Sequence, residues 1–77
     1  MELIEEQLAT LSDELIEQQH NLLLALGRRF IPTLTLEDLL QPNDYPELEG
    51  SPEFRYEEGV LAGLLTYRMA LLAKLRH

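Results

Sequence analysis

The stretch GVLAGLLTYRMALLA, residues 59–73, holds one charged side chain, Arg68, among fifteen residues. Its composition favours a helix, because leucine has a high helix propensity and β-branched residues are scarce here. Placed on a helix, the stretch has two faces. One face carries large leucines: Leu61, Leu64, Leu65, Leu71, Leu72 and, just beyond, Leu75.

The opposite face carries small side chains at steps of four and three residues. They form what we call the small-residue stripe: Gly59, Gly63, Thr66, Ala70 and Ala73. A glycine inside a helix costs about 1 kcal/mol relative to alanine, so we expect another element to approach this stripe closely. Three coverings stay open: the connector of the same chain, a second copy that completes a four-helix bundle, or a different protein.

A second apolar repeat predicts an N-terminal helix. Its members recur at steps of three and four, which makes a heptad seam with one polar member, Gln18. The seam consists of Met1, Ile4, Leu8, Leu11, Leu15, Gln18, Leu22 and Ala25. The helix is expected over about residues 2–29, with Gly27 as a possible C-cap. We expect this seam to pack on the leucine face of the last helix.

The connector, about residues 30–51, contains its own structural signals. Thr35 and Asp38 stand at capping-box spacing, which predicts a short helix over about residues 36–40. The sequence NDYP, residues 43–46, is typical of a turn. Because a long structureless loop is unusual in a compact domain, we expect the connector leucines to pack over one end of the bundle.

The last helix is expected over about residues 52–75, because a serine at the N-cap followed by proline is a strong start signal. Charge placement favours an antiparallel hairpin. Residues 1–17 carry six acids and no base, and residues 59–77 carry three bases and no acid. The whole chain, residues 1–77, is therefore predicted to be one all-α helical-hairpin domain that pairs into a four-helix bundle.

Arg68 is expected at the centre of the leucine face, opposite the neighbourhood of Glu14, Leu15 and Gln18. Three interpretations stay open, of which the weakest is that Arg68 binds the carboxylate of a ligand. In the first, its guanidinium pairs with Glu14, Glu17 or Gln18 while its stem packs on leucines. In the second, Arg68 and Gln18 form a buried polar pair that fixes the register or the oligomeric state.

Composition argues against several partners. A net charge of −8 opposes binding to nucleic acid and to anionic membranes, so we expect neither. A membrane span needs about 20 apolar residues, and residues 59–73 fall short of that and include an arginine. The chain has no cysteine, which excludes disulfides and thiolate metal sites. Its acidic start is unlike a secretory signal, and we expect a cytoplasmic protein.

No pattern for catalysis stands out. Glu17 and His20 have the spacing of di-iron bundle ligands, but both fall on the outer side of the seam. Glu14 and Glu17 resemble the paired carboxylates of helical pyrophosphatases, yet residues 59–77 offer no facing acid. No serine or threonine belongs to a nucleophile constellation. We therefore expect no catalytic residue, no metal ligand and no cofactor.

Residues 37–58 hold eight acids against one base, Arg55. This segment is either a solvated surface or a docking patch for a basic partner with aromatic anchors. The docking candidates are Asp44, Tyr45, Glu47, Glu49, Phe54 and Tyr56.

These patterns together predict a small acidic interaction or assembly protein, not an enzyme, that self-associates as a homodimer through its C-terminal helix. The alternative is an adaptor or co-chaperone subunit whose small-residue stripe and acidic connector bind a different protein. A metal-binding helical bundle is the third and weakest hypothesis.

Overall fold

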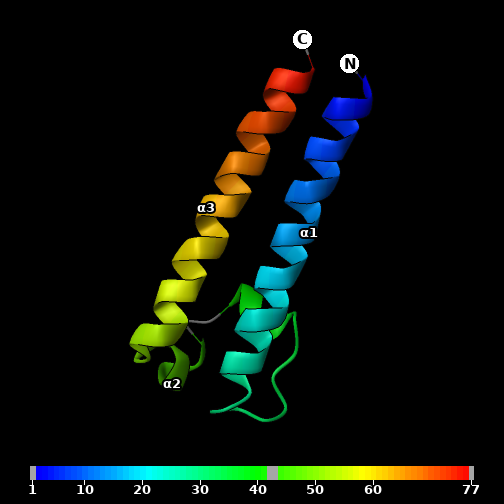
Figure 1. Cartoon of the computed structure of the whole chain (residues 1–77). Coiled ribbons are helices and arrows are strands. Elements are labelled where there is room, and N and C mark those ends of the chain that lie inside the picture. Colours follow the sequence, from blue (N-terminus) through cyan, green and yellow to red (C-terminus); the bar gives the residue numbers. More distant parts are fainter. Residues whose placement is uncertain (1, 42–43, 77) are drawn as a thin grey trace.

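The computed structural model describes residues 2–41 and 44–76. Two long helices, α1 (Glu2–Gly27) and α3 (Pro52–Leu75), run antiparallel and lie side by side (Figure 1). The connector contains a short 3-10 helix, η1 (Asp38–Leu40), and a one-turn helix, α2 (Pro46–Glu49). No strand occurs in the described ranges. The predicted all-α helical hairpin is confirmed, and the molecule measures 45 × 18 × 16 Å.

Both predicted helix boundaries at the connector have a local cause. Ser51 has an extended backbone, its Oγ accepts a hydrogen bond from the Phe54 N–H at 3.2 Å, and Pro52 takes the first helical position. At the other boundary α1 ends at Gly27, the earlier of the predicted ends, and does not continue to residue 29. The Gly27 carbonyl then accepts hydrogen bonds from the N–H groups of Phe30 and Ile31 at 3.0 and 2.9 Å, which turns the chain into the connector.

The predicted capping box in the connector is present, with an aspartate in the acidic position. The Asp38 N–H donates to Thr35 Oγ1 at 3.3 Å, and the Thr35 N–H donates back to Asp38 Oδ2 at 2.9 Å. The helix that it opens is a 3-10 turn of three residues, shorter than the predicted 36–40. Leu39 of this turn packs against the core, and 3-10 helices are usually this short.

Helix α2 was missed by the sequence analysis, which assigned residues 43–46 to a turn. Residue 43 lies outside the described residues. Tyr45 has the extended backbone that a following proline favours, and Pro46 then begins a helical turn. That turn buries Leu48 completely, which is why the segment helps to close the fold.

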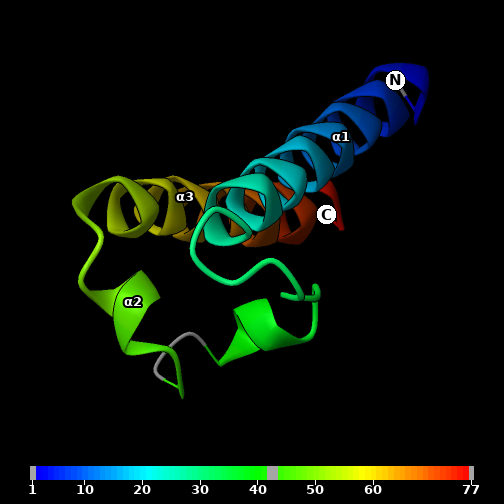
Figure 2. The ribbon, with the colours of Figure 1, turned by 90° about the horizontal axis from the view of Figure 1, so that it is seen from below.

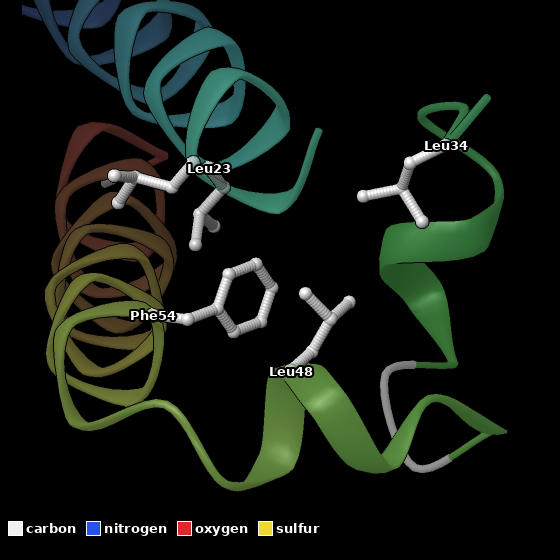
Figure 3. Packing of buried hydrophobic residues seen from close by; sticks show 5 residues of the cluster. Leu23, Leu34, Leu48 and Phe54 are labelled. Carbon is white, nitrogen blue, oxygen red and sulfur yellow. The ribbon is translucent and has the colours of Figure 1, made fainter. Parts of the chain in front are cut away.

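The hydrophobic core lies at the end of the hairpin where the connector joins α1 to α3. Five apolar side chains of the described residues are buried: Leu23, Leu26, Leu34, Leu48 and Phe54. Figure 3 shows Phe54 of α3 pointing between α1 and α2, with the leucines of both around it. The connector is therefore the part that completes the core, as the sequence predicted.

Gly27 makes this packing possible. A Cβ at this position would overlap Leu34 Cδ2 and would touch Phe54 Cε1 at 3.6 Å. None of the described glycines has a positive φ angle, so the glycine supplies space at the end of α1 and not a left-handed cap. Leu34 is fully buried and has little room to move aside.

The seam of α1 that faces α3 differs from the prediction. Besides His20, Leu24 and Gly27, which lie against the connector or the core, the half-buried and buried positions of α1 are Glu5, Ala9, Ser12, Ile16, Gln19, Leu23 and Leu26. Each follows a member of the predicted seam by one residue, and Met1 of that seam lies outside the described residues. A shift of one residue rotates a helix face by about 100°. The predicted contact between the Ile4–Leu22 seam and the leucine face of α3 is therefore wrong.

The core at the connector end of the hairpin explains why α1 is rotated relative to the prediction. Near Leu23 the helix is apolar almost all round, so local hydrophobicity does not decide which side turns inward. The connector core takes Leu23 and Leu26, and a rigid helix carries this choice toward its N-terminus. Ile16 and Ala9 then face α3, since they precede Leu23 by seven and fourteen residues.

Replacing Gly27 by alanine tests the close packing at the end of α1. Alanine has the better helix propensity, so any loss of stability comes from the overlap with Leu34. We expect Gly27→Ala to destabilise the protein by about 1–3 kcal/mol, as overpacking does, in urea unfolding followed by circular dichroism. Gly50→Ala is the control, because its nearest non-neighbouring atom would be Pro46 O at 3.4 Å, and we expect it to be almost neutral. Equal stability of both variants would contradict the packing.

Candidate functional site

The shift of the seam leaves a line of large apolar side chains uncovered on α1. We call this line the leucine stripe: Ile4, Leu8, Leu11, Leu15 and Leu22. Their exposed fractions range from 39% for Leu8 to 55% for Ile4. Single exposed leucines are ordinary on protein surfaces, but an apolar line of five residues along one helix, interrupted by Gln18, is typical of an interaction surface.

The leucine stripe lies on the side of the hairpin that the connector leaves bare. The connector gathers on one side of the helix pair (Figure 2), where His20, Leu65 and the connector leucines line a common pocket. Residues two apart on a helix point about 160° apart. Leu22 therefore points away from the side of His20. By the same rule Gly63 and Tyr67 point away from the side of Leu65, toward the side of the leucine stripe.

The small-residue stripe of α3 is exposed at all five positions. A Cβ at Gly59 or at Gly63 would meet nothing within 4 Å. The hypothesis that the connector covers this stripe, or that the stripe packs tightly within the chain, is therefore wrong. The two glycines weaken the helix without any compensating contact inside a single chain.

Arg68 makes a structural ion pair on the connector side of the hairpin. Its Nε donates to Asp13 Oδ1 at 2.5 Å, and both side chains are partly exposed. The partner differs from the predicted Glu14, Glu17 or Gln18, because the rotation of α1 brings Asp13 into reach. The interpretation of Arg68 as a surface pair between the helices holds, and its interpretation as a buried register device is wrong.

The buried polar residue of α1 is Gln19, not Gln18. Gln19 is almost fully buried, and its Nε2 donates to the Glu57 carbonyl at 2.9 Å and to Glu57 Oε1 at 2.8 Å. Gln18 is exposed beside the leucine stripe. A polar residue buried with its hydrogen bonds satisfied fixes the register of a helix pair. The buried polar position of α1 is therefore Gln19, one residue after the predicted Gln18, like the other positions of the seam.

The acidic docking candidates of the connector separate into two groups. Phe54 is a core residue and no docking anchor. Tyr45 is half-buried and packs against the core. The other candidates are exposed: Asp44, Glu47, Glu49 and Tyr56. An aromatic cluster among acids, as the sequence suggested, is therefore not formed by these side chains.

Metal-ligating side chains do not gather at one place in the described part of the chain. Within residues 2–41 and 44–76, no three histidine, aspartate or glutamate side chains lie close enough to hold a metal ion. None of the described helices is both long enough and apolar enough to cross a bilayer. The surfaces with a clear chemical character are therefore the apolar face away from the connector and the pocket beneath the connector.

Comparison of the chain with protein-family models, with curated proteins and with solved structures finds no match. A functional argument has to come from the chemistry of these two surfaces.

The connector also carries the two ionisable groups with shifted pKa values. The Thr35 N–H, which donates to the Asp38 carboxylate, lowers the pKa of Asp38 below 3.8, and the Thr35 and Tyr45 hydroxyls add to this effect. Burial raises the pKa of Tyr45 above 10.0, and the neighbouring negative charges of Asp38 and Asp44 raise it further. Folding of the connector therefore favours the charged form of Asp38 and the neutral form of Tyr45.

The pKa shift of Asp38 predicts how acid affects the connector. Since folding lowers this pKa, the stabilisation is present above the ordinary value of 3.8 and is lost as the pH falls through the lowered value. Asp38→Asn keeps the shape without the charge, so we expect it to be less stable than the native protein at pH 7. The difference should shrink as the pH falls through the lowered pKa of Asp38 and vanish below it, where the native carboxyl is also neutral.

Thermal unfolding of both proteins between pH 7 and pH 2 measures this difference. Glu37→Gln is the matched control, since the Glu37 side chain takes part in neither Thr35 hydrogen bond. A constant difference between native protein and Asp38→Asn at every pH would show that the charge of Asp38 does not matter.

Proposed function

We propose that the protein is a small non-enzymatic assembly protein whose hairpins associate in pairs, forming a four-helix bundle that buries the leucine stripe of α1 and the small-residue stripe of α3. The observation that carries the proposal is the exposure of the leucine stripe over most of the length of α1. The described apolar members of the strongest heptad pattern in the sequence are exposed in the single chain.

The dimensions of the bare face suit a dimer. The molecule extends 45 × 18 × 16 Å, so one long side of it projects an area of roughly 700–800 Å², close to what each partner contributes to an interface of standard size. A single hairpin of 77 residues buries little apolar surface for its length, and chains of this size commonly gain stability by association.

Charge also favours a second copy on this face. A chain with a net charge of −8 repels its own copies, so a dimer has to meet where acids are missing. The leucine stripe is uncharged, and α3 has no acid from Gly59 onward. Two copies joined here keep their acidic side chains apart.

The two stripes are complementary in size. A two-fold axis makes every contact of an isologous dimer occur twice. Large leucines of one α1 can then pack on the small residues of the partner's α3, and the reverse contact follows by symmetry. Close approach at Gly59 and Gly63 would also offset the helix propensity that these glycines cost.

Leu15→Glu tests the leucine stripe at its middle. In a single hairpin this side chain is 40% exposed, so the charge is tolerated, whereas a dimer would have to bury it. We expect the native protein to be a dimer of about 18 kDa, twice the chain mass of 8.9 kDa, and the variant to be a folded monomer. Light scattering over a tenfold concentration range measures the mass, and circular dichroism checks the fold.

Thr10→Glu is the matched control on α1. It adds the same charge at an exposed position about 140° away from Leu15 around the helix, and it should stay dimeric. A native protein that is monomeric at every concentration would refute the proposal and would leave this face to a different protein.

Gly63→Leu tests the small-residue stripe separately. The new side chain has open space in a single hairpin, and leucine improves helix propensity by about 0.8 kcal/mol. A monomer would therefore become more stable, whereas a dimer packed closely at this glycine would lose affinity. We expect the unfolding midpoint of the variant to fall at high protein concentration relative to the native protein. Gly63→Ala, which adds one methyl group, should have a smaller effect, and a gain in dimer stability for the leucine variant would exclude α3 from the interface.

A further inference from the structure

The connector side of the hairpin holds an apolar pocket that the proposed dimer does not use. Its volume is about 320 Å³. The walls come from three parts of the chain: Leu36, Leu39 and Leu40 of the connector, and Leu61 and Leu65 of α3. His20 of α1 and Glu37 supply its polar groups. We propose that this pocket docks an amphipathic helix of another protein that presents leucine-like side chains flanked by lysine or arginine.

The shape of the apolar surface favours a peptide. Leu40 is 78% exposed and Leu36 is 52% exposed, so the apolar surface continues beyond the pocket onto its rim. Small-molecule sites are mostly enclosed and carry several placed polar groups. An open groove with a leucine rim instead matches helix-in-groove recognition, in which side chains at i, i+3, i+4 and i+7 insert along one line.

The acidic residues around the pocket favour a basic partner. Glu37 lines the pocket. Glu17 lies one helical turn before His20, and Glu58 lies three residues before Leu61, so both point to the pocket side of their helices. Glu58 pairs with Arg55 at 3.5 Å, and none of the ion pairs among the described residues involves Glu17 or Glu37. Lysines that flank an apolar anchor would find uncompensated carboxylates here.

The same charges argue against other occupants. A second copy would bring its own acidic rim against this one, and like charges across an interface cost several kcal/mol. Nucleic acid and anionic lipid are repelled for the same reason. The pocket therefore complements the proposed dimer face and does not compete with it, because the two surfaces lie on opposite sides of the hairpin.

The probe for this site is a fluorescein-labelled peptide of 14 residues made of leucine and lysine, with its leucines at helical spacing. Fluorescence anisotropy measures its binding to the full chain. We expect saturable binding that weakens at least fivefold between 50 and 500 mM salt, since exposed charge pairs are screened. A peptide with glutamate in place of lysine, and a peptide with alanine in place of leucine, should each bind at least tenfold more weakly.

Leu40→Asn places the binding in the pocket. We expect it to weaken binding of the leucine–lysine peptide at least fivefold, and the high exposure of Leu40 makes the fold insensitive to this change. Tyr56→Asn is the matched control: Tyr56 is 70% exposed and points to the opposite side of α3 from Leu65, nine residues away. Its peptide affinity should stay within twofold of the native value.

Leu15→Glu separates this inference from the proposed dimer. It lies on the other side of the hairpin, so its peptide affinity should also stay within twofold, whether or not the native protein is a dimer. The proposal is overturned if no saturable binding occurs, if the glutamate peptide binds as well as the lysine peptide, or if Leu40→Asn leaves the affinity unchanged while Leu15→Glu or Tyr56→Asn lowers it.

Discussion

Insertion of Phe54 between α1 and the connector is the interaction on which the rest of the molecule depends. The aromatic ring is almost fully buried and meets leucines from α1, from the loop after it and from α2. Gly27 leaves the room that Leu34 needs to reach the same cluster. Because this core lies at one end of a long hairpin, it fixes the rotation of both helices about their own axes. The rest of the helix pair is held by a seam that includes Glu5, Ser12 and Gln19, and such a seam contributes little hydrophobic stabilisation.

The rotation of α1 about its axis determines which of its side chains are exposed. A helix with one apolar stripe normally turns that stripe inward, and α1 does so only near Leu23 and Leu26. Farther toward its N-terminus the inward positions other than Ile16 are small or polar, and the leucines point sideways. The free energy of a single hairpin would improve if these leucines were covered, and a further helix pair on the bare side covers them without disturbing the core. The exposed stripe and the polar seam are thus two results of the same constraint.

The helices themselves could be predicted from the sequence, but the rotation of α1 about its own axis could not. Capping residues such as Ser51 and Thr35 act through neighbours in the chain, so the helix starts and the short connector helix could be predicted from short stretches. The side of α1 that faces α3 could not be predicted in this way, because it depends on contacts with Leu34 and Leu48, which lie outside the helix in the sequence. The prediction that the strongest heptad pattern faces inward within the chain overlooked that a pattern of this kind also serves association between chains. Gln19 and Asp13 were missed for the same reason, since each lies next to a residue that the assumed rotation favoured.

The distribution of charge gives the two sides of the hairpin different chemistry. All fourteen acids lie in residues 2–58, yet the heptad positions that form the leucine stripe contain none of them. On the connector side, Glu37 stands at a pocket that is otherwise almost wholly apolar, and Glu17 and Glu58 point the same way. A net charge of −8 would have kept the chain in solution with any arrangement of these acids. Their absence from one apolar surface and their presence around the other give the two surfaces different charge preferences, which is why we propose a copy of the chain for the first surface and a basic helix for the second.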